Sequence, residues 1–390
     1  MSKKLIYFPS FTSLSDYLKK DSWLIENELK YRFYDDLFHK ENRWKYFLIT
    51  AGSEYKKENA RKNLGIDNGT IVLGDSGGFQ ITTGVLKYSD EIKVKIFNWL
   101  ENNSDYAMNL DIPPKGLYNN RYQESLDMSL KNFKYFNEHQ SGKTKFLNVL
   151  QGNNYQEIDK WYSSVKVFEF KGWGLGGVLN LSDIMLKIAF LLEKKEFEKP
   201  NNELFHFLGS TSPIHFLLYS ILQKEVNKKL SNTQISTDSS SPIMSAVFGN
   251  WYHHLSFNTL SYKSLYFGNK GKTNYVKGAK LPCLLKNCAV CDKINYDDIA
   301  AGNIRTRDLI TYHNFFFFQQ VLNQFDTLAE GHVEAIKDLV SSDYYIVFNS
   351  LIEMINSNKP IEVYNKYKNL YTKLEYSEVN IELANEFFEF

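Results

Sequence analysis

The chain alternates short apolar runs with longer stretches whose apolar positions recur at helical spacing. Six such strand-to-helix units follow one another, and each apolar run ends in a turn of polar residues or glycine. The apolar runs are 71–73, 106–110, 145–150, 167–170 with 172–177, 203–208 and 233–237. The helical stretches between them are 89–102, 120–139, 155–163, 181–194 and 213–227. This succession predicts a parallel α/β fold.

The number of units and the length of 390 residues favour a closed TIM (β/α)8 barrel. The alternation alone is also compatible with an open sheet. Residues 1–65 add two strand-like runs, and they add helical patterns at 14–20 and 22–38. We predict a catalytic barrel over 1–250, a basic, aromatic and metal-binding lobe over 251–330, and C-terminal helices over 331–390 that pack on one of them.

The stretch from Gly74 to Gln80 reads Gly-Asp-Ser-Gly-Gly-Phe-Gln and directly follows the first of the six apolar runs. Paired glycines let the backbone approach a ligand closely, and an acid at the end of a parallel strand faces the ligand crevice. The same residues could form an ordinary turn. Because similar turns recur along the chain, we expect one shared site, at Asp75, Asp111, Gln151, Gly176, Gly177, Gly209 and Asp238.

No apolar run is long enough to span a membrane, and the short run near the N-terminus is typical of a strand rather than a signal peptide. A cytoplasmic location is therefore expected. The formal net charge of +1 gives no global attraction to nucleic acid.

The segment between Asp238 and Asp292 contains no acidic residue, and its lysines alternate with tyrosine, phenylalanine and tryptophan. Lysines interleaved with aromatics suit phosphate contact and base stacking, so we expect this segment to bind nucleic acid. A solvated loop region is the alternative. The candidate binding residues are Lys263, Lys270, Lys272 and Lys277.

All three cysteines of the chain, Cys283, Cys288 and Cys291, lie close together in the sequence, and His313 follows them. Three thiolates and one imidazole form a closed tetrahedral shell, which is typical of structural zinc. Three unrelated thiols near a core histidine would be the alternative. An odd number of cysteines argues against a disulfide framework.

Two acids at separate strand ends, Asp75 and Asp238, suit a retaining displacement at an anomeric carbon. Asp111 and Gln151 suit a heterocycle with both donors and acceptors on its edge. The backbone of Gly176 and Gly177 could contact the far edge of that ring. Two apolar side chains, Phe79 and Leu208, could sandwich the ring, although Leu208 alone could equally be a core residue.

These motifs, in this order, resemble the tRNA-guanine transglycosylase superfamily over about residues 70–315. The resemblance is carried by segments 75–80, 110–113, 149–152, 174–177, 207–209 and 238–239, together with the Cys/Cys/Cys/His set. It implies a TIM barrel with a structural zinc lobe. It also implies exchange of guanine for a 7-deazaguanine at a nucleic-acid glycosidic bond.

The resemblance further implies roles for individual residues. Asp238 matches the nucleophile that forms a covalent intermediate, and Asp75 matches the general acid and base. Phe79 matches the stacking aromatic. The base-recognition set is matched by Ser76, Asp111, Gln151 and the Gly177 backbone.

Departures from the tRNA enzymes make the chain more similar to the DNA-modifying DpdA branch, which is encoded by viruses and genomic islands. The first zinc spacing is Cys-x4-Cys instead of Cys-x-Cys, residues 239–249 lack the usual arginine-bearing sequence, and 271–282 does not resemble the glycine-rich hairpins. We therefore expect insertion of a preQ0-type base into DNA.

Several alternatives remain at this point. The chain could be a tRNA enzyme that inserts preQ1, preQ0 or queuine, an inactive nucleic-acid-binding partner subunit, or an unrelated barrel glycosidase. A homodimer is possible, because the tRNA enzymes tend to dimerise.

Overall fold

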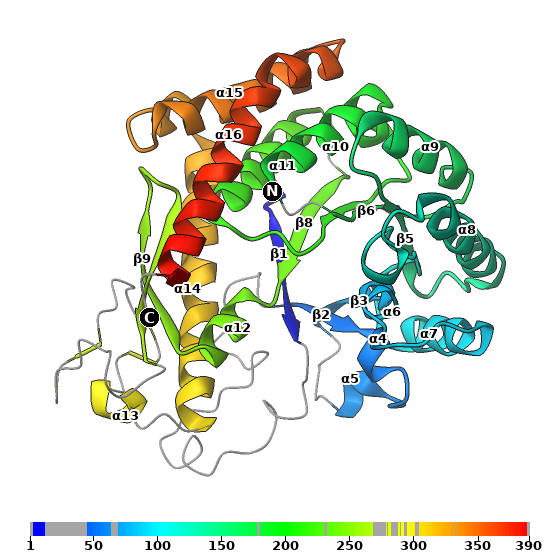
Figure 1. Ribbon diagram of the computed structural model, residues 1–390, viewed down its shortest axis with the longest axis horizontal. Helices are drawn as coiled ribbons and strands as arrows, with labels where there is room; N and C mark the ends of the chain where they lie inside the picture. Colours follow the sequence, from blue (N-terminus) through cyan, green and yellow to red (C-terminus); the bar gives the residue numbers. More distant parts are fainter. Residues whose placement is uncertain are drawn as a thin grey trace.

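The computed structural model describes residues 3–11, 45–63, 69–177, 180–229, 232–267, 278, 280–281, 288, 290–291, 295–300, 304–331 and 333–387. Eight parallel strands close into a barrel in sequence order, and β1 pairs with β8 to complete it (Figure 1). The TIM-barrel fold predicted from the sequence is therefore confirmed. The strands are β1 (Ile6–Phe11), β2 (Tyr46–Thr50), β3 (Ile71–Asp75), β4 (Tyr106–Met108), β5 (Lys145–Leu150), β6 (Gly172–Leu175), β7 (Leu204–Phe207) and β8 (Gln234–Ser239).

Helices surround the barrel and follow the strands in the expected alternation (Figure 1). The helices of this outer layer are α4 (Ala51–Glu54), α5 (Ala60–Asn63), α6 (Gly78–Thr82), α7 (Asp90–Asn103), α8 (Tyr122–His139), α9 (Tyr155–Val165), α10 (Leu181–Glu193), α11 (Pro213–Lys229) and α12 (Ser241–Val247), with 3-10 turns at Gly116–Tyr118, Glu196–Glu198 and Val333–Ile336. The helices expected at 14–20 and 22–38 lie outside the described residues.

Local sequence explains where several of these helices begin. Ser89, Asn154 and Asn180 precede α7, α9 and α10, and each side chain accepts a hydrogen bond from a backbone N–H in the first turn of its helix. Such caps satisfy donors that the helix itself leaves unpaired. The polar residues that follow the strands therefore have two roles, because some cap the next helix and others lie at the rim of the barrel.

Strand β6 is displaced from part of its predicted position. Of the two pieces considered, 167–170 and 172–177, only Gly172–Leu175 enters the barrel. Val167 is largely exposed, whereas a Cβ on Gly172 would lie 1.9 Å from the Leu204 carbonyl oxygen of β7. Because the backbones of β6 and β7 approach so closely, position 172 requires glycine. This packing, and not the β propensity of 167–170, decides which residues form the strand.

An antiparallel hairpin, β9 (Asn250–Ser256) and β10 (Ser261–Tyr266), follows the last barrel strand. The remaining helices are α13 (Tyr296–Ala300), α14 (Ile304–Glu330), α15 (Ser342–Asn356) and α16 (Pro360–Phe387). The aromatic run of α14 faces inward: the Phe318 ring lies 6.0 Å from that of Tyr7 and 5.7 Å from that of Phe216. Helices α15 and α16 cover the outside of α10 and α11 (Figure 1).

Candidate active site and candidate metal centre

The residues singled out from the sequence follow six consecutive barrel strands. Because the eight strands are parallel, their carboxyl ends face the same rim of the barrel. Asp75 ends β3, Asp238 lies near the end of β8, and the others lie just beyond their strands. The barrel therefore brings to one mouth the residues Asp75, Ser76, Asp111, Gln151, Gly176, Gly177, Leu208, Gly209 and Asp238.

The glycine pair after Asp75 is required by close packing at this rim. Gly77 has a φ of +87°, and a Cβ there would lie 2.5 Å from the Gly52 Cα. A Cβ on Gly78 would lie 2.3 Å from the carbonyl oxygen of Asp111. The turn after β3 therefore packs directly on the segment after β4, which brings two acidic side chains into one site.

The other residues of the first motif have contrasting environments. Ser76 is buried, and its hydroxyl donates to the backbone carbonyl of Asn109 over 3.1 Å. Phe79 lies on α6 with 64% of its surface exposed, so its ring is accessible to a ligand. Leu208 is partly buried against the core, as a core residue would be. The ring-stacking roles of Phe79 and Leu208 stay predictions.

Asp111 and Gln151 are both buried and directly bonded. The Gln151 Nε2 donates to the Asp111 Oδ2 over 2.7 Å. The pKa of Asp111 is raised to about 7, mainly by burial and to a smaller extent by the charge of Asp75, while the bond from Gln151 opposes the rise. A Cβ on Gly176 would lie 2.2 Å from the Gln151 Nε2, so a larger residue there would displace the Gln151 amide from its present position.

Asp75 is electrostatically coupled to the other two acids. Burial raises its pKa, and the nearby charge of Asp238 adds to the rise. The Thr50 hydroxyl and the Gly77 N–H act in the opposite direction, and the Gly77 nitrogen lies 3.3 Å from the Asp75 Oδ1. An acid with a raised pKa at a barrel mouth is suited to giving and taking protons.

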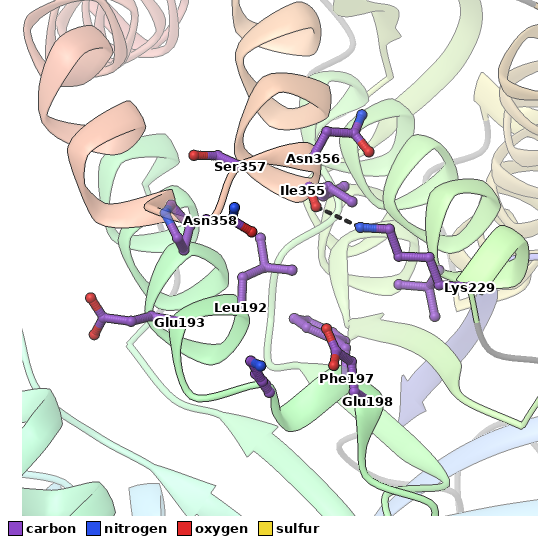
Figure 2. Close-up of a pocket in the computed structure, with 12 residues that line it drawn as sticks. Leu192, Glu193, Phe197, Glu198, Lys229, Ile355, Asn356, Ser357 and Asn358 are labelled. Carbon is purple, nitrogen blue, oxygen red and sulfur yellow. Dashed lines mark hydrogen bonds between the residues drawn. The ribbon is translucent and has the colours of Figure 1, made fainter.

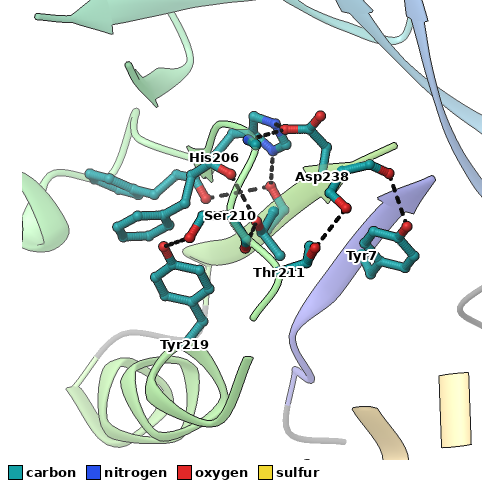
Figure 3. A network of polar contacts seen from close by, with 12 residues as sticks. Tyr7, His206, Ser210, Thr211, Tyr219 and Asp238 are labelled. Atoms are coloured by element: carbon teal, nitrogen blue, oxygen red, sulfur yellow. Dashed lines mark hydrogen bonds and ion pairs between the residues drawn. The ribbon is translucent and has the colours of Figure 1, made fainter. Parts of the chain in front are cut away.

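The two oxygens of Asp238 are held differently. Oδ1 accepts hydrogen bonds from the Gly209 N–H at 2.8 Å and from the His206 Nε2 at 3.2 Å (Figure 3). Across the described part of the chain, Oδ2 has no hydrogen-bond partner, and the side chain is 11% exposed. One oxygen therefore fixes the carboxylate while the other is available for chemistry.

His206 was not singled out from the sequence. It is fully buried within the apolar strand β7, and its Nδ1 lies 2.9 Å from the Ser236 hydroxyl (Figure 3). Because a carboxylate only accepts, the Nε2–H donates to Asp238, while the Ser236 hydroxyl at the Nδ1 also lies 3.4 Å from the Phe205 carbonyl oxygen. The one available signal was an imidazole inside a run of apolar residues.

Further hydrogen bonds tie the segment after β7 to the end of β8. The Thr237 hydroxyl lies 2.8 Å from the Phe207 carbonyl oxygen and 2.7 Å from that of Ser210. Thr211 donates to the Ser239 hydroxyl over 2.6 Å, and Figure 3 shows Thr211 and Ser210 below the Asp238 carboxylate. The position of Asp238 is thus fixed by a buried polar network.

A second cluster lies outside the barrel, where Cys288, Cys291 and His313 could hold a metal ion. The ligand atoms of these residues all lie within 4.8 Å of one another. The His313 Nδ1 is 3.4 Å from the Cys288 sulfur and 3.2 Å from the Cys291 sulfur. Cys283, the fourth ligand expected from the sequence, lies outside the described residues.

The surroundings of His313 prepare its imidazole for a metal. Its Nε2 bonds to the carbonyl oxygen of Tyr252, which leaves the Nδ1 lone pair directed at the two thiols. The ring also stacks on Trp251, with centroids 3.6 Å apart and planes 7° apart. Because Trp251 is fully buried in this stack, its side chain is excluded from stacking on nucleic-acid bases.

Of the lysines expected to bind nucleic acid, only Lys263 lies among the described residues. It is exposed on β10. The other three, Lys270, Lys272 and Lys277, lie outside the described residues, so their role stays a prediction.

A cavity of 420 Å³ lies between the helices outside the barrel (Figure 2). It is lined by the last residues of α10, α11 and α15, including Glu193, Lys229 and Ile355, and the Lys229 ammonium donates to the Ile355 carbonyl oxygen over 2.7 Å. Barrel helices run antiparallel to the strands, so these helix ends mark the amino-terminal face of the barrel. Catalytic residues of TIM barrels lie on the opposite face.

No known protein-family model matches this chain, and no curated protein matches it with significant sequence similarity. The fold and the mouth residues are compatible with an enzyme, and the Cys and His cluster is capable of binding a metal. Among the described residues, no helix combines the length and apolarity needed to cross a membrane.

Proposed function

We infer that the chain is a guanine transglycosylase that exchanges guanine in DNA for a 7-deazaguanine of the preQ0 type. The observation that carries this proposal is the divided environment of Asp238, with one oxygen held by two donors and the other unbonded. A fixed carboxylate with one free oxygen suits nucleophilic attack on a C1′ carbon. Asp75, with its raised pKa, supplies the second acid.

The reaction proceeds in two displacements. The Asp238 Oδ2 attacks C1′, the bond from C1′ to the base breaks, and Asp75 gives a proton to the departing guanine. Asp75 then takes the N9 proton of the incoming base, whose nitrogen attacks C1′ and releases Asp238. Two inversions at C1′ retain the configuration, and no nucleotide triphosphate is consumed.

Base recognition falls to the buried pair Asp111 and Gln151. An ionised Asp111 accepts from the N1–H and the 2-amino group of guanine, and the Gln151 amide donates to O6. The exposed ring of Phe79 is available to stack on the base.

DNA is the proposed polymer because the chain departs from the tRNA enzymes in its cysteine spacing and in the segments after Asp238. A guanine within a duplex cannot reach a barrel mouth, so the nucleotide must be flipped out or already single-stranded. In this proposal the metal is zinc and Cys283 is its fourth ligand. Three thiolates and one imidazole leave no open position, so the zinc is structural.

The test is to incubate the purified protein with radiolabelled guanine and, in separate reactions, duplex DNA, single-stranded DNA and bulk tRNA. Label that enters either DNA but not tRNA supports the proposal. Label that enters tRNA alone keeps the chemistry and overturns the choice of polymer. Label in none of the three contradicts the proposed activity and favours an inactive partner subunit.

Guanine binding is expected to depend on pH through Asp111. The carboxyl must be ionised to accept two N–H groups, and its pKa is raised to about 7. Affinity is therefore full above pH 8 and falls by about tenfold between pH 8 and pH 6 as the carboxyl becomes protonated. Calorimetric titration of guanine at several pH values measures this. A dissociation constant that stays flat over this range, or a slope that persists in Asp111→Asn, contradicts the assignment.

His206 is expected to position Asp238 without touching the substrate. His206→Leu removes the Nε2–H donor, so kcat should fall by roughly 10- to 100-fold while KM changes little. His206→Gln restores a donor and should recover part of the rate. A rise in KM with unchanged kcat would contradict the positioning role.

A further inference from the structure

A buried lysine, Lys187, lies directly behind Gly176 and Gly177 at the barrel mouth. Lys187 of α10 is 1% exposed, and its ammonium donates to the Gly176 carbonyl oxygen over 2.7 Å. An ammonium carries three donors, and among the described residues this is its one hydrogen-bond partner. Burial lowers the pKa of Lys187 to about 8, the charge of Asp183 opposes this, and the charge of Lys115 adds to it.

A second lysine reaches the same place from another element. Lys115 follows β4, and its ammonium has no hydrogen bond or ion pair with any described residue. The position that a Cβ on Gly177 would occupy lies 3.4 Å from the Lys115 Nζ and 3.6 Å from the Lys187 Nζ. Glycine thus leaves a small space bordered by two ammonium groups and, at 3.8 Å, by the Gln151 Oε1.

The positive charge at this space is not neutralised by an ion pair. Asp183 and Glu157 raise the pKa of Lys187, and the charge of Lys115 lowers the pKa of Asp111 and of Asp183. None of the described carboxylates, however, lies within 4 Å of either ammonium. A buried charge without an ion pair is costly unless it serves a ligand. The arrangement therefore points to an anionic group.

The order in which the recognition groups follow one another along the rim indicates which position of a bound base would carry the anionic group. Asp111 bonds to Gln151, Gln151 packs over Gly176, and Gly177 with the two lysines comes next. The edge of a guanine-type ring runs in the same order, from the 2-amino group and N1 through O6 to position 7. A ring read by Asp111 and Gln151 therefore directs its 7-substituent toward the lysines.

We propose that Lys115, Lys187 and Gly177 form a subsite for a carboxylate on position 7, so that the preferred base is a 7-carboxy-7-deazaguanine. This rests on the proposed exchange of guanine for a 7-deazaguanine, and it replaces the 7-cyano (preQ0) base of that proposal with a 7-carboxy base. A backbone phosphate is a poorer fit, because Lys187 is 1% exposed and lies behind the rim. A cationic 7-aminomethyl group would be repelled by both ammonium groups.

The test is calorimetric titration of the full chain with guanine and with 7-carboxy-, 7-cyano- and 7-aminomethyl-7-deazaguanine. The 7-carboxy base should bind at least about tenfold more tightly than the 7-aminomethyl base, with the 7-cyano base between them. Lys115→Gln should reduce that preference by about tenfold. Lys143→Gln removes an exposed lysine at the other end of the barrel and should leave the preference unchanged.

Two results would overturn the proposal in different ways. The subsite alone is overturned if guanine binds but the 7-aminomethyl base binds as tightly as the 7-carboxy base. It is also overturned if the preference for the 7-carboxy base survives in both Lys115→Gln and Lys187→Met. Failure of guanine and of all three deazaguanines to bind overturns the proposed function together with it. Melting curves of the variants show whether each one is folded.

Discussion

Replacement of Asp238 by alanine is expected to abolish guanine exchange, with a loss of at least about 10⁴-fold in rate. In the proposed mechanism this side chain supplies the attacking oxygen, and no other described carboxylate is held by the Gly209 N–H and His206 in the same way. The measurement is incorporation of labelled guanine into DNA by the variant and by the unaltered protein. Mass spectrometry of the unaltered protein with DNA should also detect a covalent adduct.

The matched control is Asp127→Ala, which removes an exposed carboxylate on α8. It should exchange guanine at the normal rate. The melting temperature of Asp238→Ala distinguishes lost chemistry from lost folding. A well-folded Asp238→Ala protein that still exchanges guanine would exclude Asp238 as the nucleophile.

The second large effect is expected on metal binding and thermal stability, when a ligand of the cluster Cys288, Cys291 and His313 is replaced. Cys288→Ser should abolish stoichiometric metal binding, because the remaining ligands no longer complete a tetrahedral shell. The melting temperature should fall by roughly 10 °C or more, because binding of a structural metal contributes directly to folding. Elemental analysis and thermal melting of the full chain measure the two effects.

Chelation of the unaltered protein should reproduce the lower melting temperature, and added zinc should restore it. Ser264→Ala, on the exposed side of β10, serves as a control for the hairpin and should retain the metal. A metal-free protein with an unchanged melting temperature would rule out a structural role.

Much of the barrel could be predicted because each strand and helix has a local signal in the sequence. The strand at Gly172–Leu175 was harder to place, since its two glycines have low β propensity and enter the barrel through close contact with Leu204. That contact joins two strands distant in sequence. Composition alone could not reveal it.

The candidate active site could also be predicted only in part, because contacts between distant segments are not visible in the sequence. Asp75, Asp111, Gln151 and Asp238 could be nominated because polar residues after parallel strands meet at one rim. His206 and Lys187 lie inside apolar segments, and their neighbours come from other elements. Only the folded chain shows what they contact. The stack of Trp251 on His313 could not be predicted for a related reason, because the two residues are far apart in the sequence.

The hydrogen bond between Gln151 and Asp111 has a consequence for the choice among purines. The bond occupies one of the two amide hydrogens of Gln151 and the Oδ2 of Asp111, so the second hydrogen and the Oδ1 can still contact a ligand. In the proposed function guanine matches both groups, since its N1–H suits the carboxylate and its O6 suits the amide. Adenine presents an acceptor and a donor in the reverse order, so it would leave both buried groups unmatched. If the chain has the proposed function, we expect it to reject adenine without any steric barrier, because the internal bond holds Asp111 as an acceptor and the Gln151 amide as a donor.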